Sequence, residues 1–190
     1  EALKEFEKAI KVDPKYTQAY NERGLANYEL GNYQAAKVDF HVATAIDPGF
    51  TDAYNNRGLA KLREGDFVGA ILDFDKVLKL DKNFKSAYVN RGSVKTKMSD
   101  DLGAIEDFNA AIRIDANYAR AYNERGMAYV STGNDAEALK DFNKAIQLDV
   151  RFANAYNNRG DVYAAAGSHE MAIDNYDSAI DINPNNILAH

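Results

Sequence analysis

Apolar and polar positions repeat along this chain with a period of 34 residues. Within one period, apolar residues spaced three and four apart predict an amphipathic helix of about three to four turns. Residues of this kind in the first period are Ala19, Tyr20, Leu25 and Tyr28. A glycine then interrupts the pattern before a second apolar stretch begins. Each period therefore predicts two helices joined by a tight turn, and the whole chain a row of such units instead of one closed core.

The residue pair Arg-Gly marks the period, three residues after the tyrosine of an Ala-Tyr pair. It occurs at Arg23-Gly24, Arg57-Gly58, Arg91-Gly92, Arg125-Gly126 and Arg159-Gly160. Small residues here let two helices approach closely, and aromatic residues later in each unit fill the remaining space. Counted from Thr17, five repeats are expected at 17–50, 51–84, 85–118, 119–152 and 153–186. The second helix of a truncated repeat is expected in 1–16 and the start of another in 187–190, so we expect a fragment of a longer array.

The turns inside the units have their own residue signals. Glycine stands where a chain leaving a helix needs a positive φ angle, and a polar N-cap candidate follows it. The glycines are Gly31, Gly65, Gly133 and Gly167, and the candidates are Asn32, Asp66, Asn134 and Ser168. The third unit has Ser99 and Asp100 instead. An aspartate near the end of each unit predicts an Asx-type turn to the next one; these are Asp13, Asp47, Asp81, Asp115 and Asp149.

These positions resemble the tetratricopeptide repeat family, whose pattern has an aromatic residue at position 4, small residues at 8 and 20, an aromatic at 24 and alanine at 27. The resemblance covers nearly the whole chain. It implies an all-α fold, a right-handed superhelical solenoid of antiparallel helix pairs. The chain departs from the family pattern at position 7, where arginine replaces the usual leucine.

The arginine at position 7 needs a partner for its charge, and position 23 supplies an acid in most units. Pairing within a unit would leave Arg159 opposite Asn175, whereas pairing with the preceding unit leaves no arginine unmatched. We therefore expect a ladder of ion pairs across the joints between units. The expected pairs are Arg23 with Glu5, Arg57 with Asp39, Arg91 with Asp73, Arg125 with Asp107 and Arg159 with Asp141. The alternative is a set of solvated charges, which would stabilise the fold little.

The resemblance implies that a ligand would lie on the concave face built from the first helices, which positions 5 and 6 face. Asparagine dominates these positions, at Asn21, Asn55, Asn56, Asn90, Asn123, Asn157 and Asn158. Because an amide offers both a donor and an acceptor, such a track suits the backbone of an extended peptide. The alternative is solvated filler left by recent duplication of the repeats. A chaperone-tail receptor is excluded, because position 9 lacks the asparagine of the family's carboxylate clamp.

Basic residues gather in the middle units, at Lys61, Arg63, Lys95, Lys97 and Arg120. Acidic residues lie toward the two ends of the chain. This distribution predicts a groove that is positive at its centre and suits a partner with an acidic stretch. Chance clustering on solvated helices is the alternative.

Composition narrows the classes of function. A formal net charge of -6 and the lack of a Lys/Arg block argue against nucleic acid as a partner. There is no cysteine, and the three histidines lack metal-ligand spacing, so we expect no metal, no cofactor and no enzyme activity in this segment. No apolar run approaches the length that spans a bilayer, which predicts no membrane insertion. The compartment is unknown, with a soluble cytoplasmic protein as the default.

Two functions of different classes follow from this sequence. The first is a protein-protein interaction scaffold that binds an extended peptide or a partner protein in the concave groove. The second is a structural segment that self-associates through uncapped ends or serves as a substrate-recruiting spacer of a larger enzyme. Concentration-dependent association would favour the second function.

Overall fold

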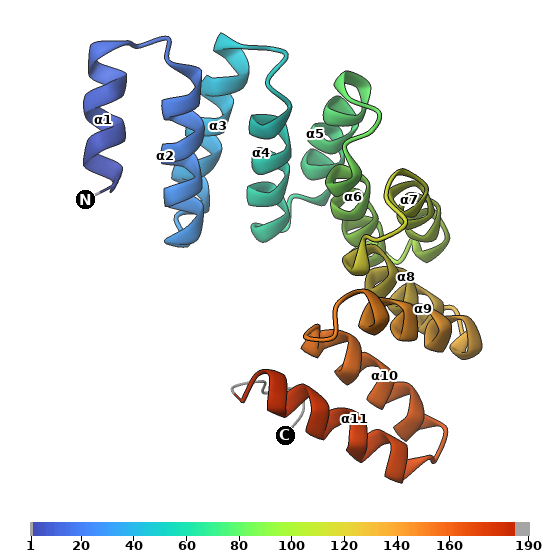
Figure 1. Cartoon of the computed structure of the whole chain (residues 1–190). Coiled ribbons are helices and arrows are strands. Elements are labelled where there is room, and N and C mark those ends of the chain that lie inside the picture. Colours follow the sequence, from blue (N-terminus) through green and yellow to red (C-terminus); the bar gives the residue numbers. More distant parts are fainter. Residues whose placement is uncertain (1, 185–190) are drawn as a thin grey trace. The chain divides into compact units, whose positions relative to one another are not determined.

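The structure, a computed structural model, describes residues 2–184, and all regular secondary structure among them is α-helical (Figure 1). The predicted start of a repeat at 187–190 lies outside these residues. Two compact units divide the chain between Val94 and Lys95, inside one helix, and each unit is described by itself. We refer to residues 17–50, 51–84, 85–118, 119–152 and 153–186 as repeats 1 to 5.

The first unit contains one single helix followed by helix pairs. Its helices are α1 (Ala2–Val12), α2 (Thr17–Glu29), α3 (Tyr33–Ile46), α4 (Thr51–Arg63), α5 (Phe67–Leu80) and α6 (Lys85–Lys97), the last of which continues into the second unit. The helices α2 and α3 form one pair and α4 and α5 the next, while α1 packs on α2 and α3 on α4. Each helix therefore packs mainly on its neighbours in the sequence, as predicted for a row of repeats.

The second unit repeats this arrangement. Its further helices are α7 (Asp101–Ile114), α8 (Ala119–Ser131), α9 (Asp135–Leu148), α10 (Ala153–Ala165) and α11 (His169–Ile182). The pairs are α8 with α9 and α10 with α11, and α7 packs on α8 as α9 packs on α10. The helix-turn-helix pairs confirm the predicted all-α class.

The turns within the repeats follow the glycine signal. Gly31, Gly65, Gly133 and Gly167 all have positive φ angles, from 75° to 80°. Ser99 adopts φ 62° at the equivalent place, so the third turn keeps the geometry without glycine. The N-cap candidates stand at the predicted positions, but among the caps of the second helices only Asp66 and Asp100 accept a backbone N–H bond with their side chains.

The turns between repeats are Asx turns, as predicted. In each of them the aspartate Oδ1 accepts the backbone N–H of the residue two places later, at 2.8 to 3.0 Å. The aspartates are Asp13, Asp47, Asp81, Asp115 and Asp149. Because these bonds satisfy the first backbone donors of the loop, one turn geometry recurs at every joint between repeats.

The second helix of each of repeats 1 to 4 contributes a phenylalanine to the centre of the core. These rings, Phe40, Phe74, Phe108 and Phe142, are completely buried. The glycine of the Arg-Gly pair makes room for them: a Cβ atom on Gly126 would lie 2.6 Å from Cε1 of Phe142. Glycine is thus required at this position by close packing.

Candidate functional site

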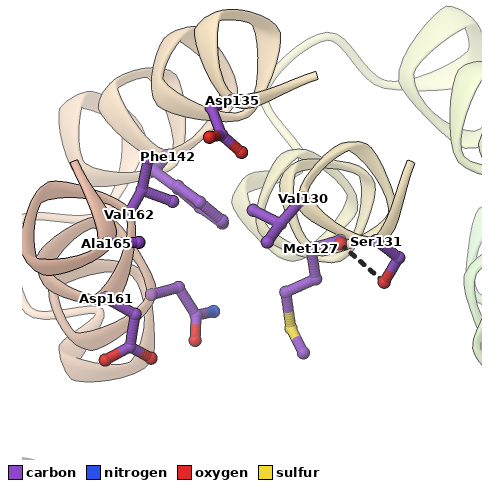
Figure 2. Close-up of a pocket in the computed structure, with 9 residues that line it drawn as sticks. Met127, Val130, Ser131, Asp135, Phe142, Asp161, Val162 and Ala165 are labelled. Carbon is purple, nitrogen blue, oxygen red and sulfur yellow. Dashed lines mark hydrogen bonds between the residues drawn. The ribbon is translucent and has the colours of Figure 1, made fainter. Parts of the chain in front are cut away.

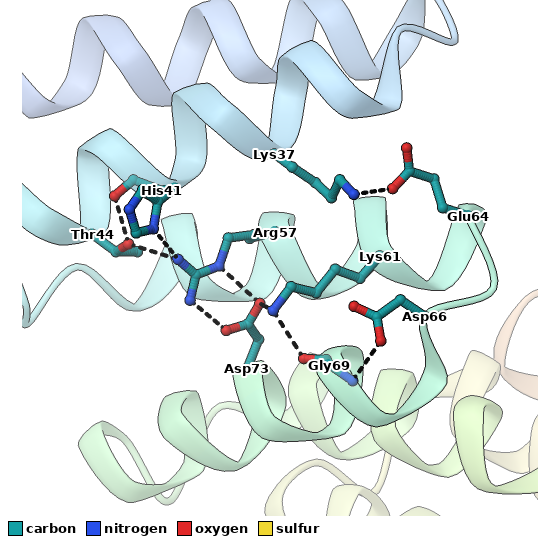
Figure 3. Close-up of polar contacts among 9 residues, drawn as sticks. All are labelled: Lys37, His41, Thr44, Arg57, Lys61, Glu64, Asp66, Gly69 and Asp73. Carbon is teal, nitrogen blue, oxygen red and sulfur yellow. Dashed lines mark hydrogen bonds and ion pairs between the residues drawn. The ribbon is translucent and has the colours of Figure 1, made fainter.

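The arginine at position 7 pairs with the acid of its own repeat. Arg57 Nη2 donates to Asp73 Oδ1 at 2.6 Å and its Nε to Oδ2 at 2.9 Å, which is a bidentate arrangement (Figure 3). Arg23 pairs in the same way with Asp39, and Arg125 with Asp141. The hydrogen bond to Asp73 raises the pKa of Arg57 above its ordinary value, although burial lowers it. The predicted pairing with the preceding repeat's acid is therefore wrong for these arginines.

The last repeat shows why the prediction failed. Arg159 lies opposite Asn175, and its Nε donates to the amide oxygen Oδ1 at 2.7 Å. An amide oxygen accepts a hydrogen bond as a carboxylate does, so Arg159 has a partner in its own repeat without an acid. The prediction considered only acids as partners and therefore left Arg159 unmatched opposite Asn175.

The same arginines also bridge the joints between repeats, by contacting position 25 of the preceding repeat. Nη1 of Arg57 reaches back to the preceding second helix, 3.2 Å from His41 Nδ1 and 3.0 Å from Thr44 Oγ1 (Figure 3). The other arginines that reach back this way are Arg91 to Asp75, Arg125 to Asn109 and Arg159 to Asn143. Successive residues turn by about 100° around a helix. Position 23 therefore faces its own first helix, while position 25 faces the next repeat.

A tyrosine three residues before each arginine supports the guanidinium group. The Cζ atom of Arg57 lies 5.2 Å from the ring centroid of Tyr54. The same contact recurs at 5.5 to 5.6 Å for Arg23 with Tyr20, Arg91 with Tyr88, Arg125 with Tyr122 and Arg159 with Tyr156. These distances are within the range of cation–π attraction. The tyrosine of the Ala-Tyr pair and the arginine thus form one structural element.

Two of the five residues of the predicted basic centre are paired inside the fold. Lys61 Nζ lies 2.8 Å from Asp73 Oδ2 and donates to the carbonyl of Gly69, and Lys95 repeats this geometry with Asp107 and Gly103. Arg63 donates to the hydroxyl of Tyr28. The remaining two residues, Lys97 and Arg120, are exposed. Lys61 and Lys95 thus neutralise buried carboxylates, and the basic surface expected for an acidic partner is correspondingly smaller.

The predicted asparagine track is mostly internal. Five of its residues, Asn21, Asn55, Asn90, Asn123 and Asn157, are at least nine-tenths buried, while Asn56 and Asn158 are half-buried. The amide of position 6 donates to the amide oxygen at position 5 of the preceding repeat. The three bonds of this kind are Asn56 to Asn21 at 3.0 Å, Asn90 to Asn55 at 3.0 Å and Asn158 to Asn123 at 2.8 Å. These asparagines join consecutive first helices, so the buried ones are not exposed to read a peptide.

Asn157 differs from the other position 5 residues. Both polar atoms of its side-chain amide are buried and have no hydrogen-bond partner among the described residues. In the earlier repeats the equivalent amide oxygen is satisfied from the next first helix.

A cavity of about 250 Å³ lies between the first helices α8 and α10 and the second helix α9 (Figure 2). Its walls are mostly apolar and include two large apolar side chains that are exposed, Met127 and Val130. The lining residues are Met127, Val130, Ser131, Asp135, Phe142, Asn158, Asp161, Val162 and Ala165. Of the predicted peptide-binding residues, Asn158 is the one that lines it. The sequence analysis missed this cavity, because its lining residues come from three helices and are far apart in the sequence.

Two carboxylates lie at opposite ends of the apolar wall in the view of Figure 2. Asp135 is the first residue of α9, where the helix dipole favours negative charge. Asp161 accepts a hydrogen bond from the hydroxyl of Tyr176 at 2.8 Å. Burial, and then this bond, raise the pKa of Tyr176 above its ordinary value. Tyr176 therefore remains protonated at neutral pH and holds Asp161 in place.

The equivalent positions at the joint between repeats 1 and 2 are filled by larger side chains. Tyr28 stands where the cavity has Val130, Tyr33 where it has Asp135, and Arg63 where it has Ala165. The two tyrosine rings meet edge to face with centroids 5.3 Å apart. Arg63 Nε donates to the Tyr28 hydroxyl at 2.9 Å. The loss of large side chains at these three repeat positions is the sequence signal from which the cavity could have been predicted.

Within residues 2–184, no group of three or more His, Asp or Glu side chains is arranged to hold a metal ion. None of the helices in that range is long and apolar enough to cross a bilayer.

Tandem helix pairs, each packed on the next, define a repeat protein of the protein-interaction scaffold class. The chain belongs to the tetratricopeptide repeat family. A family model described as "Tetratricopeptide repeat" matches residues 17–50, 51–84 and 86–118, and a second with the same description matches 153–186. A third, described as "TPR repeat", matches 1–31 and 126–167. Members of such families are typically interaction modules without catalytic activity. Among curated proteins, none matches the chain.

Solved structures share the fold. The chain is 25% identical to YrrB, with a TM-score of 0.67 over 97% of this chain and 95% of that one. It is 22% identical to PilF of Pseudomonas aeruginosa, with a TM-score of 0.82 over 91% of this chain and 79% of that one. It is 21% identical to MamA from Desulfovibrio magneticus RS-1, with a TM-score of 0.74 over 90% and 97%. These structures confirm the predicted solenoid of helix pairs.

Proposed function

We propose that this chain binds an extended segment of a partner protein on the face formed by its first helices, and that the cavity between α8 and α10 anchors the segment. The observation that carries this proposal is the cavity itself, about 250 Å³ with apolar walls and polar groups at its ends. Pockets for small molecules usually measure about 300–1,000 Å³. A smaller pocket suits one or two side chains of a peptide better than a cofactor.

The lining residues support this reading. Met127 and Val130 are exposed by 42% and 41% although they stand next to a packed core. A flexible methionine beside an aliphatic residue adapts to different apolar side chains. The structure of YrrB is described as that of a tetratricopeptide repeat protein with an unusual peptide-binding site. An array of similar length and fold therefore binds peptide in that protein.

The proposal replaces the predicted amide readers by a different anchor. Asn158 keeps a role because it is half-buried and lines the cavity. Its Nδ2 donates to Asn123, while its own Oδ1 is the atom that a peptide N–H would approach. The other asparagines of the ladder contribute by fixing the distance between consecutive first helices.

The experiment is a selection of random-sequence peptides displayed on phage. The targets are the wild-type chain and a Val130→Tyr/Ala165→Arg variant, in which the cavity is filled with the residues of the joint between repeats 1 and 2. We expect the wild-type chain to enrich a family of related peptides that the filled variant does not bind. The control is Val38→Tyr/Ala116→Arg, which makes the same two changes at exposed positions outside the cavity. No enrichment, or equal binding by the filled variant, would refute the proposal.

A further inference from the structure

We infer that the cavity between α8 and α10 takes a long aliphatic side chain that ends in a positive charge, a lysine or arginine of the bound partner. This inference rests on the proposed function and specifies the chemistry of its ligand. It differs from the acidic partner expected from the sequence, because Lys61 and Lys95 are paired inside the fold.

The first argument is the order of apolar and acidic groups. Met127, Val130 and Ala165 present exposed apolar surface beside the buried Phe142 and Val162, and a carboxylate lies toward each end of this apolar wall (Figure 2). A hydrocarbon stem would bury its surface on this wall, while a cationic head would reach a carboxylate at the rim. Lysine and arginine combine such a stem and head in one side chain. An uncharged aliphatic side chain would leave the carboxylates unused, and an acidic one would be repelled by them.

The second argument is that these two acids lack a cation. Among the described residues, neither Asp135 nor Asp161 forms a salt bridge, and both are exposed. The buried aspartates at position 23 are treated differently by the fold. Asp39, Asp73 and Asp141 each lie 2.6 Å from an arginine. The protein therefore has an unmatched pair of negative charges at the two ends of its apolar cavity.

The third argument concerns the position of Asp161. The equivalent position in repeats 1 to 4 holds Leu25, Leu59, Ser93 and Met127. Among the five repeats, aspartate therefore occurs at this position only in repeat 5. A helix dipole accounts for Asp135 at the start of α9, but Asp161 lies in the middle of α10. Its single hydrogen bond, from the Tyr176 hydroxyl, uses Oδ1 and leaves Oδ2 for a ligand. One oxygen of this carboxylate therefore has no hydrogen-bond partner among the described residues.

The test uses peptides from the selection described above. We expect the enriched peptides to share one lysine or arginine. Replacing a shared lysine by norleucine, which keeps most of the stem and removes the charge, should weaken binding about tenfold. The double variant Asp161→Asn/Asp135→Asn should weaken binding of the lysine peptide by a similar factor and leave the norleucine peptide unaffected, and the two single variants identify the carboxylate that receives the cation. Fluorescence anisotropy with labelled peptides measures these affinities.

Matched controls separate charge from structure. Asp177→Asn on α11 and Asp52→Asn in the first turn of α4 remove exposed acids outside the cavity, and neither should change peptide affinity. Enriched peptides without a shared cation, or full binding by the Asp161→Asn/Asp135→Asn variant, would overturn this inference while the proposed function stands. Absence of any peptide that depends on an unfilled cavity would overturn both.

Discussion

The joint between repeats 1 and 2 and the joint between repeats 4 and 5 have cores built from equivalent positions, but different side chains lie over these cores. We call the side chains that lie over a core its cover. The core is Ala36, Phe40 and Ala60 in the first case and Ala138, Phe142 and Val162 in the second. Tyr28 packs against the first core and contacts both Tyr33 and Arg63. Val130, Asp135 and Ala165 surround a cavity over the second. The difference shows that the core positions of the repeat are retained, while the positions over the core vary from one joint to the next.

The largest expected effect tests whether the two cores are equivalent. Phe40→Ala and Phe142→Ala each remove a fully buried ring, and each should lower the free energy of unfolding by about 3–5 kcal/mol. Urea denaturation followed by circular dichroism measures both losses. A much smaller loss at Phe142 would mean that the cavity leaves its core loosely packed, and the two joints would then differ in more than their covers.

The core was the part that could be predicted from the sequence. Glycine, alanine and an aromatic residue recur at fixed places because close packing limits the size of the side chain at each, as Gly126 beside Phe142 shows. The polar contacts could not be predicted in the same way. Arg57 reaches His41 and Asp73, both 16 residues away, and the direction depends on which side of a helix each partner faces. The cavity results from smaller side chains at several repeat positions together, and no single residue indicates it.

The next effect concerns the acid at position 23, which is Asp73 in repeat 2 and Asn175 in repeat 5. Asp73 holds two cations, Arg57 and Lys61, whereas Asn175 holds Arg159 alone. Asp73→Asn should therefore lower the free energy of unfolding by about 2–3 kcal/mol, because two half-buried cations lose their carboxylate. Thermal and urea unfolding of the variant would measure this loss.

A compensating change sharpens that prediction. Repeat 5 has Tyr163 where repeat 2 has Lys61, so Asp73→Asn/Lys61→Tyr copies the neutral arrangement of repeat 5. This double variant should recover much of the stability lost in Asp73→Asn, since one unpaired cation is removed. If the double variant is less stable than the single one, the pairing of Lys61 with Asp73 does not explain the difference between the repeats.

A smaller effect follows from exchanging the covers. Tyr28→Val/Arg63→Ala should lower the free energy of unfolding by about 1–2 kcal/mol, because the half-buried Tyr28 ring leaves the surface of the core. The reverse exchange, Val130→Tyr/Ala165→Arg, should raise it by up to about 1 kcal/mol, since a new ring covers apolar wall. If both exchanges lowered the free energy of unfolding equally, each set of covering side chains would be adapted to its own joint. The cavity would then not be explained by the smaller side chains alone.

The smallest expected effect is the coupling between Tyr28 and Arg63. Arg63 Cζ lies 5.9 Å from the Tyr28 ring centroid, and its Nε donates to the hydroxyl, which raises the pKa of Arg63. Because Arg63 is exposed, the pair should contribute only about 0.5–1 kcal/mol. A double-mutant cycle with Tyr28→Phe and Arg63→Met measures it from urea midpoints. A coupling energy well above this range would mean that the pair contributes strongly to the stability of the joint. The stability lost in Tyr28→Val/Arg63→Ala would then come from the broken Tyr28–Arg63 interaction and not from exposure of the core.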